Sequence, residues 1–124
     1  PVRADYRAVP RVLFTSPEVA SVGPTESELL AQGVEIKKVV VPLSIVAKAN
    51  IADISEGFVK IIASKKTNVL LSASIVSPNA SEMVQELTIA IQNYLTAAHV
   101  AQTIHVFPSW SEVIRVACTK LSKL

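Results

Sequence analysis

The chain has 124 residues, of which half are hydrophobic and 18% are charged, and its formal net charge is +2. That length suits one domain and leaves no room for a second domain of ordinary size. The basic residues are scattered apart from two adjacent lysine pairs, so no concentrated positive patch for nucleic acid is present. The single cysteine, Cys118, excludes an internal disulfide and a cysteine-based zinc site, and it favours a reducing, cytoplasmic location.

The chain begins with a polar, irregular stretch at residues 1–9, which we interpret as a lead-in from an absent upstream domain. Short extended segments are expected at residues 11–15 and 20–23, with prolines beside them. Residues 25–32 predict a helix because they open on the capping-box pattern Thr-x-x-Glu. Gly33 suits the C-terminal end of that helix.

The middle of the chain predicts three further strands. Residues 34–43 are rich in valine and isoleucine, which favours an extended conformation. Residues 44–56 show weak periodicity and are expected to form a loop with helical turns. Residues 57–63 and 69–76 are apolar runs separated by five turn-forming residues, and they predict an antiparallel hairpin.

Helices are predicted in the last third of the chain. Asn79 is expected to cap a helix whose apolar residues recur at helical spacing as far as Leu95. Thr96 is expected to cap a short helix, and a last helix is expected to begin at Ser109. Strands first and helices afterwards predict an α+β fold, an antiparallel sheet with flanking helices, in a single domain over residues 1–124.

Residues 87–111 contain no Asp, Glu, Lys or Arg. A membrane span is disfavoured because amide, imidazole and proline groups interrupt the run, and each polar group would need a partner in lipid. Burial in a subunit interface explains the run better, since the cores of interfaces are depleted in charge. We therefore expect a dimer through this region, with Ile91 as a central apolar position.

Several patterns of residues that suggest chemistry are weak. The three glycines have neither dinucleotide-fold nor phosphate-loop spacing. Ser111, His105 and Asp53 are the residue types of a serine hydrolase, but no nucleophile elbow is present. His99 and His105 have no carboxylate at ligand spacing, so no metal site is expected. Cys118 lies on an apolar helical stripe and is interpreted as a buried structural thiol.

Four stretches, in order, resemble parts of one family. They are residues 9–26 (Val-Pro-x-Val-x-Phe-Thr-x-Pro-x-x-Ala-x-Val-Gly-x-Thr-Glu), residues 57–60 (Gly-Phe-Val-Lys), residues 78–85 (Pro-Asn-Ala-Ser-Glu-Met-Val-Gln) and residues 105–112 (His-Val-Phe-Pro-Ser-Trp-Ser-Glu). Together they resemble the C-terminal dimerisation domain of FAD-dependent pyridine nucleotide-disulfide oxidoreductases, which include lipoamide dehydrogenase, mercuric reductase and quinone-reductase-like members.

The resemblance implies a fold, a partner and cofactors. In that family the domain forms most of an obligate homodimer interface, and FAD and NAD(P) are bound by upstream domains. The domain also completes the active site of the other subunit. The fragment alone is therefore expected to bind neither cofactor and to be inactive.

The resemblance also assigns the candidate site residues. The family's catalytic histidine corresponds to Phe107 and its orienting glutamate to Glu112, and phenylalanine cannot transfer a proton. His105, two residues upstream, is the candidate substitute base, although its side chain is expected to point to the opposite face from that of Phe107. Glu112 has a second interpretation, since Ser109-x-x-Glu112 is a capping box. The backbone of Phe107 and Pro108 is expected to face the partner subunit's FAD, and the bond between them is a candidate cis peptide.

Three functional hypotheses remain open from the sequence. The first is a homodimeric flavoprotein oxidoreductase that passes electrons from NAD(P)H through FAD to an acceptor. A quinone-like acceptor is favoured over a disulfide, because Phe107 is not a base and because mercuric reductases end in a cysteine pair that this chain lacks. The second is a stand-alone interaction module without enzyme activity. The third is a disulfide reductase in which water or His105 replaces the missing base.

Overall fold

The computed structural model describes all 124 residues, and its centre is one antiparallel sheet with strand order β1-β2-β5-β4-β3. The strands are β1 (Arg11–Leu13), β2 (Glu18–Val22), β3 (Ile36–Pro42), β4 (Phe58–Ser64) and β5 (Leu70–Ser77). The helices are α1 (Glu26–Ala31), α2 (Ala47–Ile51), α3 (Ala80–Gln92), α4 (Ala97–Gln102) and α5 (Glu112–Ser122). Short 3-10 turns lie at η1 (Tyr6–Ala8) and η2 (Leu43–Ile45).

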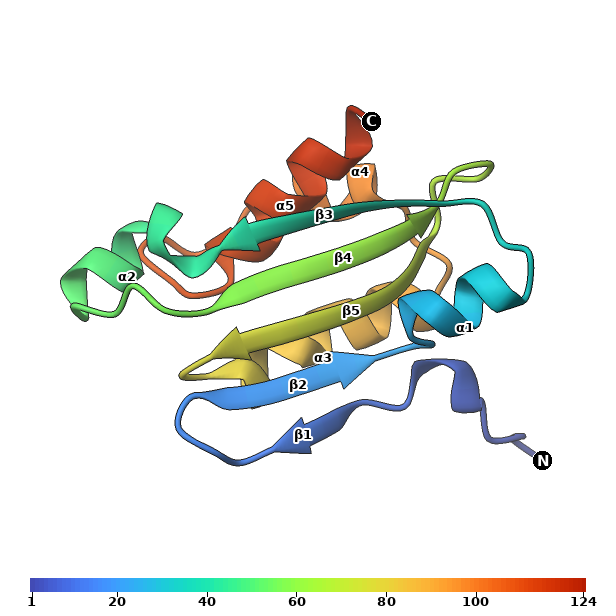
Figure 1. Cartoon of the computed structure of the whole chain (residues 1–124), viewed down its shortest axis with the longest axis horizontal. Helices are drawn as coiled ribbons and strands as arrows, with labels where there is room; N and C mark the ends of the chain where they lie inside the picture. The colour runs from blue at the N-terminus through green and yellow to red at the C-terminus, as the bar shows by residue number, and fades with distance from the viewer.

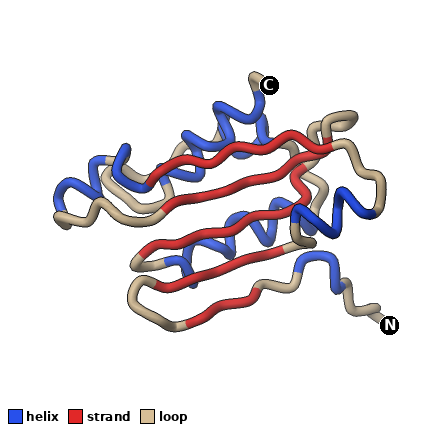
Figure 2. Tube along the Cα trace, in the orientation of Figure 1, coloured by secondary structure: helices blue, strands red, loops and turns tan.

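The helices cover the two faces of the sheet unequally. Figure 1 shows α3, α4 and α5 behind the sheet, whereas α1 lies in front of one end of it. The tube in Figure 2 shows that most of the front face carries no helix. The α+β class predicted from the chain is confirmed, with one covered and one open sheet face. None of the helices is both long and apolar enough to cross a bilayer.

The core lies between the sheet and the three helices behind it. One cross-strand row on that face runs Val41, Val59, Ile75 and Ala20, and every member is at most 1% exposed. Because side chains alternate along a strand, their neighbours face the open side. The fold therefore buries one apolar face and leaves the other for additional contacts.

Most of the predicted elements are present in the structure. The hairpin over residues 57–63 and 69–76 is confirmed as β4 and β5. The capping box that opens α1 forms both of its hydrogen bonds, and Gly33 follows the helix with a positive φ of 74°. Residues 44–56 contain part of η2 and the helix α2, so the helical turns expected there are real.

The lead-in at residues 1–9 is attached to the domain more firmly than its polar sequence indicates. Arg7 lies over the ring of Tyr94 at 4.2 Å from its centroid and donates a hydrogen bond to the backbone oxygen of Gln92 at 3.3 Å. Asp5 accepts hydrogen bonds from Arg7, and Ala8 is buried. The stretch was expected to be irregular, and this is wrong for residues 6–8, which form the 3-10 turn η1. The guanidinium of Arg7 attaches this turn near the C-terminal end of α3.

The N-terminal end of α3 differs from its prediction. Asn79 precedes the helix, but its side chain makes no capping hydrogen bond. Instead the carboxylate of Glu18 accepts from the backbone amide of Ser81 at 3.0 Å and from its hydroxyl at 2.8 Å. An acid from the adjacent strand thus satisfies the helix terminus, where negative charge is favoured.

Replacing Glu18 with alanine is expected to lower the free energy of unfolding by about 1–2 kcal/mol, because the amide of Ser81 loses its acceptor. Glu18→Gln is expected to lose less, since an amide oxygen still accepts these bonds. Urea unfolding followed by circular dichroism measures both variants. Equal stability of Glu18→Ala and the wild type would show that this carboxylate is not the cap.

The carboxylate of Glu26 fastens α1 to the open face of the sheet. Its two oxygens each accept a hydrogen bond at 2.5 Å, one from Lys38 on β3 and one from Lys60 on β4. The hydrogen bond from Lys38 and, to a smaller extent, the one from Lys60 lower the pKa of Glu26 below its ordinary value of 4.5. The charged form of this group is therefore favoured in the folded chain.

A lowered pKa in the folded state makes the contribution of Glu26 depend on pH. This contribution is present above 4.5, where the unfolded chain is also ionised, and it is lost as the pH falls through the folded pKa. Glu26→Gln is therefore expected to be less stable than the wild type at neutral pH and equal to it in acid. Chemical unfolding across this range checks the result, with Glu35→Gln as a control for an exposed carboxylate. A stability difference that does not change with pH would contradict the assignment.

Candidate functional site

The predicted site residues lie in and beside the segment at residues 103–109, which we call the Phe107 loop. It connects α4 to α5, and no backbone–backbone hydrogen bond involves any residue from 104 to 109. The Phe107–Pro108 peptide bond is cis, as expected. Because residues 104 to 109 make no backbone–backbone hydrogen bond, the backbone oxygen of Phe107 is not engaged by the backbone of its own chain.

Three apolar side chains of the Phe107 loop face outward. Ile104 is 96% exposed, Val106 75% and Phe107 72%. Contiguous exposed apolar side chains of this kind are typical of a surface that another molecule covers. The need to keep such a surface apolar explains why the last part of the run at residues 87–111 carries no charge.

The rest of the uncharged run at residues 87–111 lies mostly in the hydrophobic core and not on the surface. Ile91 is only 4% exposed and packs in the hydrophobic core, whereas Ile89 and Tyr94 are more than half exposed. Taking Ile91 as a central interface position is therefore wrong. It occupies the inward face of α3, and a charge there would test the stability of the domain.

His105 points into the domain, opposite to its neighbours. Its side chain is 6% exposed, Nε2 lies 2.5 Å from Oε1 of Glu86, and Nδ1 lies 2.9 Å from the backbone oxygen of Thr103. Both ring nitrogens are thus occupied by oxygen acceptors. Neither is free for a Ser111 hydroxyl, so the serine-hydrolase arrangement is not assembled.

Glu112 is 9% exposed and forms half of the predicted capping box. Its Oε2 accepts from the backbone amide of Ser109 at 3.3 Å, but the Ser109 hydroxyl donates to the backbone oxygen of Val106 at 2.6 Å. The helix begins at Glu112 and has no side-chain cap at Ser111, so its start at Ser109 is wrong. Oε1 of Glu112 has no hydrogen-bond partner within the chain.

The other polar candidates have structural surroundings. His99 accepts from the backbone amide of Thr96 at 3.0 Å and completes a capping box at the start of α4. The thiol of Cys118 is fully buried, and burial, together with the charge of Glu86, raises its pKa to about 12. This confirms that Cys118 is a buried thiol, and a neutral one is a poor nucleophile. No group of three or more His, Cys, Asp or Glu residues is placed to hold a metal ion.

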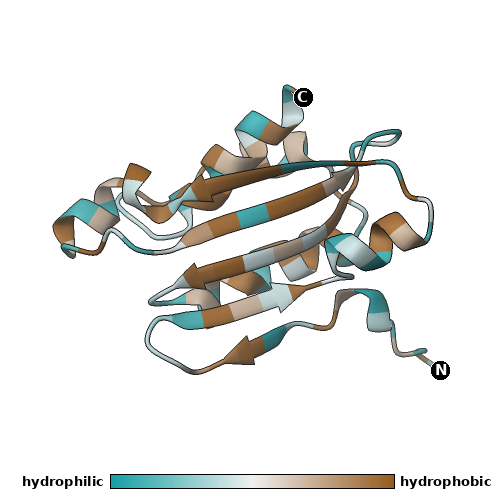
Figure 3. Cartoon of the chain, in the orientation of Figure 1, coloured by the Kyte–Doolittle hydropathy of each residue, from teal (hydrophilic) through white to brown (hydrophobic).

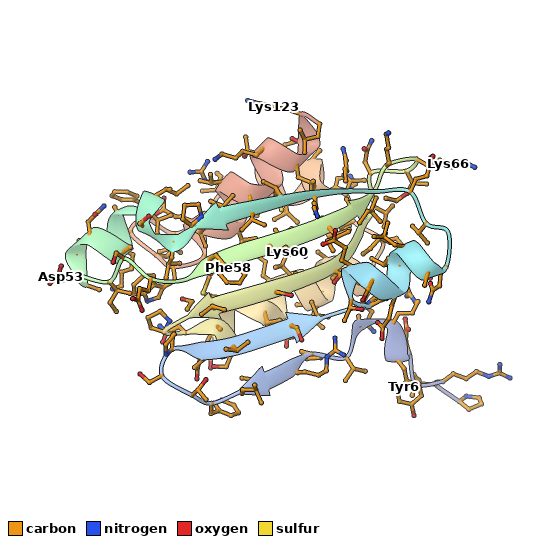
Figure 4. The ribbon with its side chains drawn as sticks, viewed as in Figure 1. Tyr6, Asp53, Phe58, Lys60, Lys66 and Lys123 are labelled. Atoms are coloured by element: carbon orange, nitrogen blue, oxygen red, sulfur yellow. The ribbon has the colours of Figure 1, made fainter.

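The open sheet face is a second surface, which was not predicted from the sequence. A cross-strand row of apolar residues runs over all five strands on this face: Leu13, Val19, Val76, Phe58 and Pro42. Figure 4 places Phe58 and Lys60 on this face, and Figure 3 shows apolar ends of neighbouring strands side by side. The signal was the alternation within each strand, since Phe58 and Lys60 fall out of phase with buried Val59 and Ile61.

An open groove of about 390 Å³ adjoins that row. Its lining combines strand residues with the turn before α1, and it includes Arg11, Ser21, Ser72 and Ser74. Arg11 donates a hydrogen bond to the backbone oxygen of Gly23 at 2.7 Å. The open face is thus part apolar and part polar, as surfaces between domains of one chain commonly are.

Comparisons with known proteins agree with this fold. Residues 9–118 match the family model described as the dimerisation domain of pyridine nucleotide-disulphide oxidoreductases. The chain is 42% identical over 113 residues to mitochondrial dihydrolipoyl dehydrogenase from Pisum sativum, covering 91% of this chain and 23% of that protein. It is 41% identical over 113 residues to leghemoglobin reductase from Glycine max, covering 91% of this chain and 22% of that protein.

Two solved structures share the fold. LpdA from Mycobacterium tuberculosis superposes with a TM-score of 0.89 at 36% identity, covering 98% of this chain and 26% of that chain. The HOCl-induced flavoprotein disulfide reductase RclA from Escherichia coli superposes with a TM-score of 0.87 at 26% identity, covering 91% and 26%. The chain thus spans about a quarter of the length of these proteins.

Proposed function

The chain belongs to the dimerisation-domain family of the pyridine nucleotide-disulphide oxidoreductases, and from that premise we propose how it serves such an enzyme. It joins two copies of a flavoprotein and places its Phe107 loop at the flavin of the partner subunit. The observation that carries the proposal is the outward, uncharged apolar surface of that loop. Self-association follows from the family, and its location at this loop is our proposal.

The two exposed surfaces suit two different neighbours. The Phe107 loop, with Ile104 and Val106, is assigned to the second copy of the chain. The open sheet face, with Phe58 and Leu13, is assigned to the upstream domains that would bind FAD and NAD(P). This division is supported by the connections of the loop, which joins α4 to α5 behind the sheet, whereas α1 lies on the open side.

The residues of the Phe107 loop fit a flavin of the partner subunit without acting as a base. FAD, when bound, takes a hydride from NAD(P)H and passes electrons to the acceptor. The outward ring of Phe107 would shield such a group from water, and its carbonyl and that of Pro108 face no backbone donor in their own chain. Glu112 would then help to begin α5, and the nearby amide of Ser109 supports that role.

The same residues favour a quinone-like acceptor over a disulfide. Reduction of a disulfide by this family needs a proton donor beside the thiols, and Phe107 cannot supply one. His105 is turned inward and both of its nitrogens are engaged, so its geometry does not favour proton transfer to an outside thiol. A quinone would need no proton donor from the Phe107 loop, since solvent could supply the two protons that accompany its two-electron reduction.

The proposal is tested on the whole protein that contains this chain. Its flavin is reduced with NADH or NADPH in the absence of oxygen and is then mixed with a quinone or with oxidised lipoamide. We expect flavin absorbance to return faster with the quinone. Faster return with lipoamide would favour the disulfide reductase, and a dimeric protein without flavin would favour the stand-alone interaction module.

A further inference from the structure

The Phe107 loop exposes apolar side chains and has few backbone hydrogen bonds to hold it in place. None of its residues from 104 to 109 makes a backbone–backbone hydrogen bond. Three of its side chains, Ile104, Val106 and Phe107, are largely exposed and therefore pack on little. Segments with few buried contacts and few backbone hydrogen bonds open easily, so the order of this loop depends on its side-chain bonds.

Five hydrogen bonds from side chains restrain the loop, and four of them are local. Those four join residues at most four positions apart: Thr103 to His99, His105 to Thr103, Ser109 to Val106, and Ser109 to Glu112. The fifth joins His105 to Glu86, 19 residues earlier on α3. It is the one hydrogen bond that connects the loop to a part of the fold outside its two flanking helices.

The chemistry of this pair makes it strong. Nδ1 of His105 faces the carbonyl oxygen of Thr103, and Nε2 faces the carboxylate of Glu86, so both nitrogens are placed to donate. A hydrogen bond from a ring N–H to a carboxylate is charge-assisted, and such a bond, here at 6% and 31% exposure of the two side chains, is roughly twice as strong as one between neutral groups. Cys118 also lies within reach of the charge of Glu86, and burial, together with that charge, raises the pKa of its thiol to about 12, so the thiol is neutral.

We propose that Glu86, acting through His105, is the positioning residue that fixes the Phe107 loop with its apolar side chains outward. Neighbouring side chains in an extended segment alternate in direction, so holding His105 inward turns Ile104 and Val106 outward. This positioning role rests on the geometry of the Glu86–His105 pair and not on the proposed function. That the ordered loop then meets a partner subunit rests on the function proposed above.

Fluorine NMR separates positioning from simple stabilisation. The chain has three phenylalanines, so 4-fluorophenylalanine gives separate signals for Phe14, Phe58 and Phe107. In Glu86→Ala we expect the Phe107 signal to shift and broaden while the other two stay in place. Alanine is the strongest helix former, so α3 is retained. The dimer dissociation constant is expected to rise by about ten- to a hundredfold, as loss of a charged hydrogen bond predicts.

A matched control and a conservative variant make the result specific. Glu82→Ala changes the charge on the same helix at an exposed position without a hydrogen bond, and it is expected to leave the Phe107 signal unchanged. Glu86→Gln keeps an oxygen acceptor for Nε2 and is expected to restore most of that signal. In a double variant with His105→Ala, the second change is expected to add little, because both act on one bond.

Two outcomes would overturn the positioning role. One is an unchanged Phe107 signal in Glu86→Ala, and the other is an equal shift of all three signals, which indicates general destabilisation. A wild-type chain that stays monomeric while its Phe107 signal still responds to Glu86→Ala would support positioning and contradict the proposed function. The two ideas therefore fail separately.

Discussion

The variant Ile104→Asp is expected to be monomeric at concentrations where the wild-type chain is a dimer. The side chain of Ile104 is 96% exposed in the single chain, so an aspartate there leaves the domain fold intact. In a two-fold dimer the same change buries two carboxylates, one from each copy, without partners. Each buried unpaired charge costs several kcal/mol, so the dissociation constant is expected to rise more than about a hundredfold.

Sedimentation velocity checks this result, and a matched substitution controls for the added charge. Leu30→Asp adds the same charge at an exposed leucine of α1, which lies on the opposite side of the sheet from α3 to α5. Leu30→Asp is expected to keep the dimer. If Ile104→Asp remains as dimeric as Leu30→Asp, the Phe107 loop is not part of the interface.

The variant Phe107→His is expected to increase turnover of dihydrolipoamide by the whole protein by about a hundredfold, because a positioned general base contributes at least that factor. Glu112 accepts a hydrogen bond from the amide of Ser109, two residues after this position, and its Oε1 has no hydrogen-bond partner within the chain. An introduced imidazole would therefore find a carboxylate to orient it. The gain depends on a redox-active cysteine pair in the upstream part of the protein.

Phe107→Leu is the control for this gain, since it changes the ring without adding a base. It is expected to leave dithiol turnover as low as in the wild type. In a protein whose upstream part carries the cysteine pair, a histidine variant that behaves like the leucine variant would show that this position does not set the choice of acceptor. Quinone reduction measured in parallel reports whether the flavin still receives electrons.

Local patterns predicted the elements whose determinants lie within a few residues. The capping box at α1, the Thr96 cap at α4 and the five-residue turn between β4 and β5 were readable because each uses neighbours in the chain. The start of α3 was not, because its hydrogen bonds come from Glu18, 63 residues before Ser81. Nothing near Asn79 indicates that an acid from another strand replaces its side chain.

The same distinction explains the candidate site. His105 was expected to face away from Phe107, and the structure places one inside and the other outside. Strict alternation would put these two residues, two positions apart, on one face, so this arrangement comes from the irregular path of the loop and not from an extended strand. It did not identify Glu86 as the partner of His105, since that contact depends on how α3 packs beside the loop. Similarly, the uncharged run predicted an interface, but the sequence did not show which of its residues face outward. The fold shows that Ile91 is buried and Ile104 is exposed.

The central claim is that this chain is the part of the protein that holds two subunits together. Sedimentation equilibrium of the 124-residue chain tests it most directly, because the result is a mass independent of shape. The account predicts a concentration-dependent approach to twice the 13.3 kDa of one chain. A single species of 13.3 kDa at every concentration, with the chain folded, would contradict it.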